Sequence, residues 1–279
     1  MKDREALFID TLKKSGATWG IGDDGVALDS LVYAADSFVE GSHFKRGWFS
    51  LEELAYKALA VNVSDLYAMN ATPRYALLTL SLPRDFSPAQ TRRLSLAIAR
   101  VCDEFKIKLI GGDTILASLL GISFTLIGSL DSKPLVRKGV KPGDILAYTG
   151  KIGESLKDLR RLMRGFSLAP TSRFIRPVLR PKLISALAPL AHAGMDISDG
   201  LFLELERLST LNRVGFEFRR AIPRAIGCSG EEYEMLFAFP PRFLKKAQSI
   251  AKQHRVALNV FARATKGGIY RAHCKGHHC

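Results

Sequence analysis

Apolar and polar positions along this 279-residue chain follow two spacings, one helical and one strand-like. Residues 51–69 (LEELAYKALAVNVSDLYAM) repeat apolar side chains at helical intervals, and Ser50 is suited to cap that helix. Ser87 and Pro88 suit the cap and first position of a second helix over residues 88–105. The pattern also predicts helices over residues 4–15, 153–164, 181–192 and 241–254, and one beginning near Asp199. Strands are predicted over residues 31–36, 75–82, 107–110, 122–130, 145–149, 214–218, 234–239, 256–262 and 268–272.

A segment rich in turn residues divides the chain near its middle. Pro134 and residues 136–144 (VRKGVKPGD) combine proline, glycine and charge, as connections between domains often do. Strands and helices occur on both sides of it. The pattern therefore predicts an α/β (α+β) fold with two domains, residues 1–134 and 135–279.

Composition favours a soluble globular protein. Hydrophobic residues make up 47% of the chain, enough for a sizeable core, and no apolar run reaches the roughly 20 residues that span a bilayer. The N-terminus MKDREALFID is charged and resembles an amphipathic helix more than a signal peptide. We therefore expect a cytoplasmic protein without a membrane partner. The cysteines form no CxxC pair, and we expect reduced thiols at Cys102, Cys228, Cys274 and Cys279.

Charge is distributed unequally between the two halves. The net charge is +14, with 15 basic and 16 acidic residues in 1–134 but 26 and 11 in 135–279. A basic half can attract phosphorylated molecules or nucleic acid. No aromatic residues interleave with the basic pairs at stacking intervals, so a nucleic-acid groove is not indicated and no nucleic-acid partner is expected.

Acidic residues gather in short turns beside glycine or at the ends of apolar segments. These turns are Gly22-Asp23-Asp24-Gly25, Ala35-Asp36, Asn62-Val63-Ser64-Asp65, Gly111-Gly112-Asp113-Thr114 and Asp196-Ile197-Ser198-Asp199-Gly200. A single Asp-Gly turn is more often a plain loop than a ligand site. Five such groups are costly to desolvate unless cations compensate them. Because Mg²⁺ bridges carboxylates to substrate phosphates, the set points to metal-assisted phosphate chemistry.

The common nucleotide-binding motifs are missing from the chain. There is no GxxxxGK[ST] loop, no GxGxxG fingerprint and no protein-kinase motif set. Gly111 and Gly112 supply a backbone that can approach a phosphate closely. A phosphotransferase with this sequence must therefore use another architecture.

Seven segments resemble, in order, the motifs of thiamine-monophosphate kinase, a family within the aminoimidazole-ribonucleotide synthetase-like superfamily of ATP-binding proteins. They are GIGDDGVAL (20–28), AADSFVEGSHF (34–44), LAYKALAVNVSDLYAM (54–69), LIGGDT (109–114), VRKGVKPGD (136–144), MDISDGL (195–201) and SGEEYEM (229–235). The resemblance implies Mg²⁺-dependent in-line transfer of the ATP γ-phosphate to thiamine monophosphate, giving thiamine diphosphate and ADP. It also implies a two-domain fold whose N-terminal domains pair through their sheets in a homodimer, with ATP at the interface.

The resemblance assigns roles to individual residues of this chain. The metal ligands of the family match Asp23, Asp36, Asp65, Asp113, Asp196 and Asp199. The ATP contacts match Gly112, Asp113, Arg137 and Ser198, and the substrate contacts match His43 and Glu231. An acceptor phosphate oxygen needs no strong base, so no general base is assigned, and several Mg²⁺ ions are expected to neutralise the phosphates.

The chain departs from the family at three places. Ala34-Ala35 precedes Asp36 where the family has a hydroxyl residue, which removes an oxygen ligand. Glu232 takes the place of an aspartate. The family's aromatic residue near the C-terminus has no clear counterpart; Cys274 or His277 falls near it, and Tyr270 is a further candidate. The tail CKGHHC (274–279) contains two cysteines and two histidines, which are common zinc ligands, but they are too close together in sequence to surround one Zn²⁺. A tail without a specific function is the simpler interpretation.

Other interpretations stay open at this point. The chain could be another ATP-dependent member of the superfamily, such as a selenophosphate synthetase, a purine-pathway cyclo-ligase or a hydrogenase-maturation protein. A relative that binds nucleotide without turnover is a further alternative, to which Ala34-Ala35 lends weight.

Overall fold

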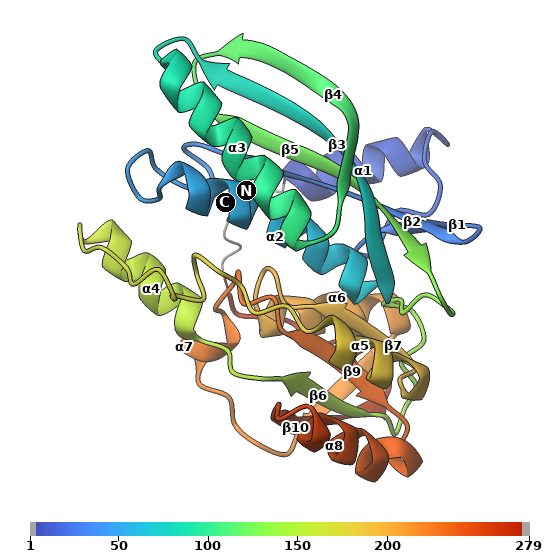
Figure 1. The fold of residues 1–279 in the computed structure, drawn as a ribbon. Helices are drawn as coiled ribbons and strands as arrows, with labels where there is room; N and C mark the ends of the chain where they lie inside the picture. The colour runs from blue at the N-terminus through green and yellow to red at the C-terminus, as the bar shows by residue number, and fades with distance from the viewer. Residues whose placement is uncertain (1–3, 275–279) are drawn as a thin grey trace.

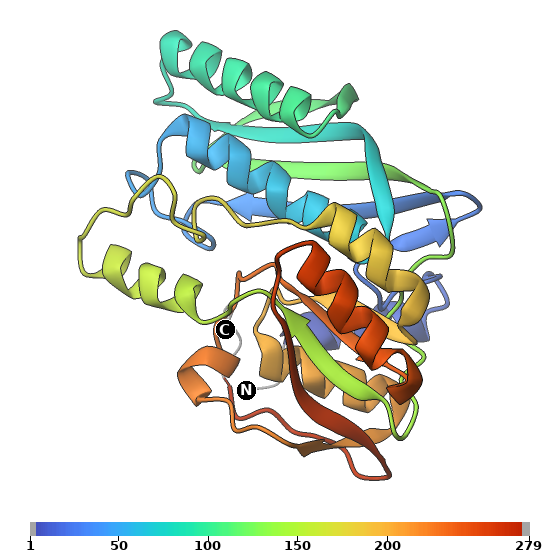
Figure 2. The same cartoon turned by 60° about the horizontal axis from the view of Figure 1, so that its bottom comes forward.

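The N-terminal sheet is covered by helices α2 (Leu51–Ala68) and α3 (Pro88–Glu104) on one face (Figures 1 and 2). The computed structural model describes residues 4–274, and its first sheet has the strand order β1-β2-β5-β3-β4. Neighbouring strands are antiparallel except β3 and β4, which are parallel and are connected through α3. The strands are β1 (Val26–Leu28), β2 (Leu31–Val39), β3 (Ala71–Pro83), β4 (Lys108–Ala117) and β5 (Gly121–Leu130).

Helix α2 lies between the two halves of the molecule. Ser50 caps it as expected: Ser50 Oγ accepts a hydrogen bond from the Glu53 N–H (3.2 Å), and the Glu53 carboxylate accepts one from the Ser50 N–H (2.8 Å). One side of α2 packs on the N-terminal sheet and α3, and another contacts β7 (Ala193–Asp196) and α5 (Pro181–Leu187). Because it is enclosed in this way, α2 also buries Lys57, Asn62 and Ser64, which need polar partners.

The C-terminal sheet lies between two layers of helices and has the strand order β7-β9-β6-β10-β8, with all neighbours antiparallel. Its side chains alternate: Leu236 packs with helix α6 (Leu201–Asn212), whereas Phe237 packs with α5 and α8 (Leu244–Gln253). The remaining elements are α1 (Arg4–Lys14), β6 (Ile145–Thr149), α4 (Glu154–Met163), η1 (Ala188–Leu190), β8 (Val214–Phe218), α7 (Arg224–Gly227), β9 (Met235–Phe239), η2 (Pro241–Phe243) and β10 (Leu258–Lys266). Within the described part of the chain, no helix has both the length and the apolar character needed to cross a bilayer.

Two of the predicted elements are wrong. The strand predicted over 268–272 does not form, because Gly267 and Gly268 have φ angles of 75° and 78° and end the ladder after β10. The helix predicted over 181–192 stops at Leu187 and continues as the short 3-10 helix η1, which contains Pro189. Proline has no backbone N–H to donate and cannot continue an α-helix.

Strand β4 is longer than predicted and contains the two glycines expected to form a loop. Gly112 has a φ of 149°, and a Cβ there would lie 1.8 Å from the Leu78 carbonyl oxygen. Glycine at this position therefore lets β4 pair closely with β3. The proposed domain boundary at residue 134 falls between β5 and β6 and stays a prediction.

The expectation of reduced thiols is wrong for Cys228 and Cys274, which form a disulfide. It links the end of α7 to the last residue that the structure describes. The two cysteines are 46 residues apart in sequence, and only the packing of the C-terminal half brings their Cα atoms to 5.6 Å. Cys102 is free, and burial raises the pKa of its thiol to about 11. Cys279 and His277 lie outside the described residues.

Candidate active site

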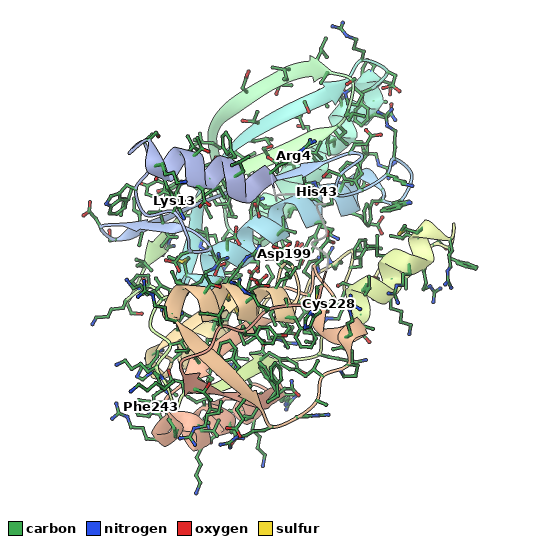
Figure 3. The ribbon with its side chains drawn as sticks, turned by 180° about the vertical axis from the view of Figure 1, so that it is seen from behind. Arg4, Lys13, His43, Asp199, Cys228 and Phe243 are labelled. Carbon is green, nitrogen blue, oxygen red and sulfur yellow. A yellow bond between two sulfur atoms is a disulfide. The ribbon has the colours of Figure 1, made fainter. Side chains whose placement is uncertain are left out.

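A cleft of about 440 Å³ lies where α2 meets the loops of both halves. Its size falls in the range of small-molecule sites. In Figure 3, His43 from the N-terminal half and Asp199 from the C-terminal half both lie at this junction. The predicted site residues that line the cleft are Asp23, Asp36, His43, Asp65, Arg137, Ser198, Asp199 and Glu231.

Three carboxylates converge beside the cleft. Oxygen atoms of Asp24, Asp65 and Asp196 lie within 4.8 Å of one another. Asp65 comes from α2, Asp196 ends β7, and Asp24 belongs to the loop before β1. Ser64 Oγ donates to Asp196 Oδ2 (2.6 Å), whereas buried Asp196 Oδ1 has no hydrogen-bond partner among the described residues. A buried, unpaired carboxylate oxygen beside two other carboxylates fits a ligand of a hard cation such as Mg²⁺.

Burial raises the pKa of all three carboxyl groups. The pKa of Asp65 is raised well above its ordinary value by burial, and then by the charges of Asp36, Asp196 and Asp24. The pKa of Asp196 is also raised well above its ordinary value, by burial and then by Asp24. Burial raises the pKa of Asp24 too, although Arg137 opposes this. Three mutually repelling groups in one place indicate that a cation belongs among them.

Asp24 is a member of the carboxylate cluster that the sequence analysis did not select as a ligand. The family resemblance selects its neighbour Asp23 as the ligand, but the structure places Asp24 in the cluster. Asp23 instead accepts a hydrogen bond from the Arg137 backbone N–H (2.6 Å). The signal was present in the sequence, because both residues belong to the Gly-Asp-Asp-Gly turn.

Arg137 connects the N-terminal acidic turn to the second half of the chain. Its Nη1 donates to the Gly22 carbonyl (3.2 Å) and its Nη2 forms an ion pair with Asp24. Burial alone would lower the pKa of Arg137, but the nearby carboxylates, Asp24 foremost, offset this and raise it. A permanently charged guanidinium therefore lines the cleft next to the carboxylate cluster, where it can bind a phosphate.

Asp199 lies in a second charged group formed with helix α6. Arg207 pairs through Nη2 with Asp199 and through Nη1 with Glu204 (2.8 Å). Glu204 also accepts from the Asp199 N–H (3.0 Å) and from Ser198 Oγ (3.5 Å), and burial raises its pKa. The sequence analysis missed Arg207 and Glu204, since no motif marks them and only the helix brings them to the loop.

His43 and Glu231 face the cleft from opposite halves of the chain. His43 Nδ1 accepts a hydrogen bond from the Val39 N–H (3.0 Å), which in a neutral ring places the proton on Nε2. Glu231 forms an ion pair with Lys57 of α2. Both side chains are therefore held in place at the cleft, as positions that orient a substrate require.

Gly112 and Asp113 do not line this cleft. Asp113 is exposed on β4, the last strand of the sheet, where its Oδ1 accepts from the Thr114 N–H (2.8 Å). The register aligns Asp113 with Thr79 of β3, then Ser123 of β5, and finally Ser37 of β2, which does line the cleft. Three strand spacings correspond to roughly 14 Å. The roles of Gly112 and Asp113 stay predictions.

Of the positions at which the chain departs from the family motifs, Ala35 lies at the cleft and Glu232 lies away from it. Ala35 lines the cleft with a methyl group, and the next residue, Asp36, donates its N–H to Asn62 Oδ1 (2.8 Å). Glu232 is buried, and its Oε1 accepts from the Gly153 N–H (2.8 Å), so it supports the backbone and does not face the cleft.

Tyr270 packs against Phe202, Phe216 and Phe218 and does not line the cleft. Phe38 and Tyr233 are aromatic residues that do. Tyr233 is partly exposed there, whereas the Phe38 side chain is only 2% exposed.

Comparisons with known proteins find relatives that match most of the chain. Residues 22–130 match the family model described as AIR synthase related protein, N-terminal domain. Thiamine-monophosphate kinase of Aquifex aeolicus is 30% identical over 262 residues, covering 84% of this chain and 85% of the relative. The enzyme of the same name from Escherichia coli K12 is 34% identical over 269 residues, covering 84% and 81%.

Solved structures extend the similarity to nearly the whole chain. The structure of AaThiL complexed with AMPPCP and TMP has a TM-score of 0.85 and 26% identity, covering 99% of this chain and 98% of that one. The hydrogenase maturation protein HypE of E. coli has a TM-score of 0.68 at 17% identity, which is a likeness of fold alone. The expected superfamily fold is therefore confirmed.

Proposed function

The chain belongs to the thiamine-monophosphate kinase family, and we propose from this that it transfers the γ-phosphate of ATP to thiamine monophosphate, giving ADP and thiamine diphosphate. The observation that carries the proposal is the convergence of Asp24, Asp65 and Asp196 beside a cleft that Arg137 and Glu231 also line. The similar structure of AaThiL was solved in complex with AMPPCP, an ATP analogue, and TMP. The cleft is lined mainly by carboxylates, so a donor nucleotide and a phosphorylated acceptor would bind there together with Mg²⁺, and Arg137 adds a positive charge for a phosphate.

We assign different residues of the cleft to the nucleotide and to the acceptor substrate. Phosphoryl transfer depends on alignment and charge neutralisation more than on covalent chemistry. In this proposal, Arg137 and the Ser198–Asp199 loop hold the nucleotide phosphates, while His43 and Glu231 orient the acceptor; all of these residues line the cleft. Because Nδ1 of His43 already accepts from the backbone, we assign this residue to orientation and not to proton removal.

The carboxylates fit Mg²⁺ as the metal. Asp24, Asp65 and Asp196 offer hard oxygen ligands, and the orphaned Asp196 Oδ1 is a ready ligand atom. Asp23, Asp36 and Asp199 line the adjoining cleft and can complete further ion sites or hold metal-bound water. Bound Mg²⁺ would neutralise the negative charge on the transferring phosphate.

We also propose that the chain forms a homodimer through the uncovered face of its N-terminal sheet. Tyr75, Leu77 and Ile115 on β3 and β4 are 46%, 39% and 52% exposed. A large apolar face on a soluble protein favours association. The row from Ser37 to Asp113 runs across this same face, so a nucleotide bound between two such sheets could meet Asp113 and Gly112.

Replacing Leu77 by Asp tests the dimer. The wild-type mass by light scattering should be about twice 30.8 kDa, and the L77D mass should be 30.8 kDa. A wild-type protein that is monomeric by light scattering and still converts thiamine monophosphate to thiamine diphosphate contradicts the proposed dimer.

A cytoplasmic location follows from the proposed use of ATP, which that compartment supplies. The Cys228–Cys274 disulfide is unusual there. Cell fractionation of the tagged chain tests the location, and recovery only in an extracytoplasmic fraction contradicts it.

Acceptor selectivity tests the proposed reaction. The purified chain with ATP and Mg²⁺ should consume ATP when thiamine monophosphate is present but not when thiamine replaces it, because the acceptor atom is a phosphate oxygen. Equal ATP consumption with both compounds, or with neither, contradicts the proposal.

A further inference from the structure

Lys57 is the most completely buried cation near the cleft. Its side chain is 0% exposed, and it lies on α2 two turns before Asp65. The ammonium is 3.4 Å from the centre of the Phe174 ring, with the rings of Phe49 and Phe38 at 5.6 and 5.8 Å. Charged lysine is almost never buried without a partner, because desolvation is costly.

Glu231 is the carboxylate that compensates this charge. Glu231 Oε2 accepts a hydrogen bond from the Lys57 ammonium. The Glu231 side chain is 23% exposed and lines the cleft. Burial lowers the pKa of Lys57, and the Glu231 charge opposes that shift. The lysine itself has no solvent exposure and therefore cannot reach a ligand in the cleft.

The backbone of Glu231 is fixed by the same elements that carry the acidic cluster. Glu231 adopts a left-handed conformation, φ 57°, which costs a non-glycine residue strain energy. Its N–H donates to the Ser198 carbonyl (2.5 Å), and its carbonyl accepts from Ser155 Oγ (2.7 Å). Ser198 belongs to the loop between Asp196 and Asp199, and Lys57 belongs to the helix of Asp65. Glu231 is thus held at a fixed offset from the carboxylate cluster by both its backbone and its side chain.

We propose that Lys57 is a positioning residue for the acceptor substrate: its ammonium binds Oε2 of Glu231 and so orients Oε1 to accept a hydrogen bond from thiamine monophosphate. The inference rests on the proposed function, since it concerns the same cleft. An ion pair that served stability alone would not require its carboxylate to lie at the cleft surface. Apolar side chains of similar volume often stabilise a buried position as well as an ion pair does.

Steady-state kinetics of Lys57→Met separate positioning from stability. We expect the KM for thiamine monophosphate to rise about tenfold, the loss of one charge-assisted contact. The KM for ATP should change less than about twofold, because Lys57 has no contact with the nucleotide side of the cleft. Lys57→Leu, which also removes the ammonium and leaves an apolar side chain among the same rings, provides the same test if the methionine variant does not fold.

A double-mutant cycle with Glu231→Gln shows whether Lys57 acts through Glu231. If it does, K57M adds no further rise in the KM for thiamine monophosphate once Glu231 is changed. Lys151→Met is the matched control, because Lys151 forms the same type of pair with Glu154 at an exposed position, and its kinetics should equal wild type. Additive effects, or equal rises in both KM values, overturn the inference.

Wild-type turnover tests the proposed function by itself. If the wild type does not phosphorylate thiamine monophosphate, a crystal structure of K57M or K57L decides the inference independently. Displacement of the Glu231 carboxylate from the cleft wall supports it, and an unmoved carboxylate overturns it.

Discussion

Replacing Asp65 by Asn should stabilise the metal-free protein while abolishing its response to Mg²⁺. Asn preserves the shape of the side chain but removes one charge from three carboxylates whose oxygens lie within 4.8 Å of one another. At an effective dielectric constant near 20, each fully ionised pair at that distance costs about 3 kcal/mol. Partial protonation relieves some of this, because the pKa values of Asp65 and Asp196 are raised. We therefore expect a gain of about 2 kcal/mol at neutral pH in EDTA, or roughly 4 to 8 °C in Tm.

The sign of the pH dependence follows from the raised pKa values. Above the ordinary carboxyl pKa near 4, the folded protein binds more protons at Asp65 than the unfolded chain does. The stability of the metal-free wild type therefore falls as the pH rises from 4 towards the folded-state pKa of Asp65. Asp65→Asn should show a smaller fall, so its advantage over wild type grows over this range.

Thermal unfolding with EDTA and with Mg²⁺ measures both effects. Mg²⁺ at about 100 times its Kd should stabilise the wild type by about 2.7 kcal/mol, and should have little effect on Asp65→Asn. Asp144→Asn is the control, because buried Asp144 lies outside the cleft and pairs with His192 at 3.0 Å. It should lower Tm equally in both conditions. A lower Tm for Asp65→Asn in EDTA would show that the three carboxylates do not repel one another, and an undiminished Mg²⁺ shift would show that Asp65 does not bind the metal.

Two further changes have expected outcomes that are simple to measure. Arg137→Ala should raise the KM for ATP at least about tenfold, because a phosphate loses a charge-assisted hydrogen bond; an unchanged KM for ATP in steady-state assays rules out the contact. Cys274→Ser should lower the free energy of unfolding by up to about 4 kcal/mol, since the disulfide spans 46 residues; urea denaturation under oxidising conditions that finds no loss contradicts a constraining role.

Local features of the sequence were enough to predict the elements that hold the site. Ser50 and the apolar spacing of residues 51–69 define α2 almost to the residue, because caps and periodicity act within a few positions. The strands over 145–149 and 214–218 also match β6 and β8. The acidic turns could be recognised as a set, and most of them do meet at the cleft.

Contacts between distant segments could not be read in the same way. The Cys228–Cys274 disulfide, the Lys57–Glu231 pair and the place of Asp24 in the cluster all depend on packing across dozens of residues or more. Periodicity carries no information about such pairs. A local motif also does not show how far its residue lies from the cleft. The motif of Asp113 suggests a ligand, but the sheet register places Asp113 three strands from Ser37.

We propose that this cleft transfers a phosphate from ATP to thiamine monophosphate with Mg²⁺ held by its carboxylates. The most direct measurement is ³¹P NMR of the purified chain with ATP, thiamine monophosphate and Mg²⁺, with an EDTA sample alongside. We expect ADP and thiamine diphosphate to appear in equal amounts with Mg²⁺ and neither to appear with EDTA. Release of inorganic phosphate without thiamine diphosphate, or no reaction at all, would contradict the claim.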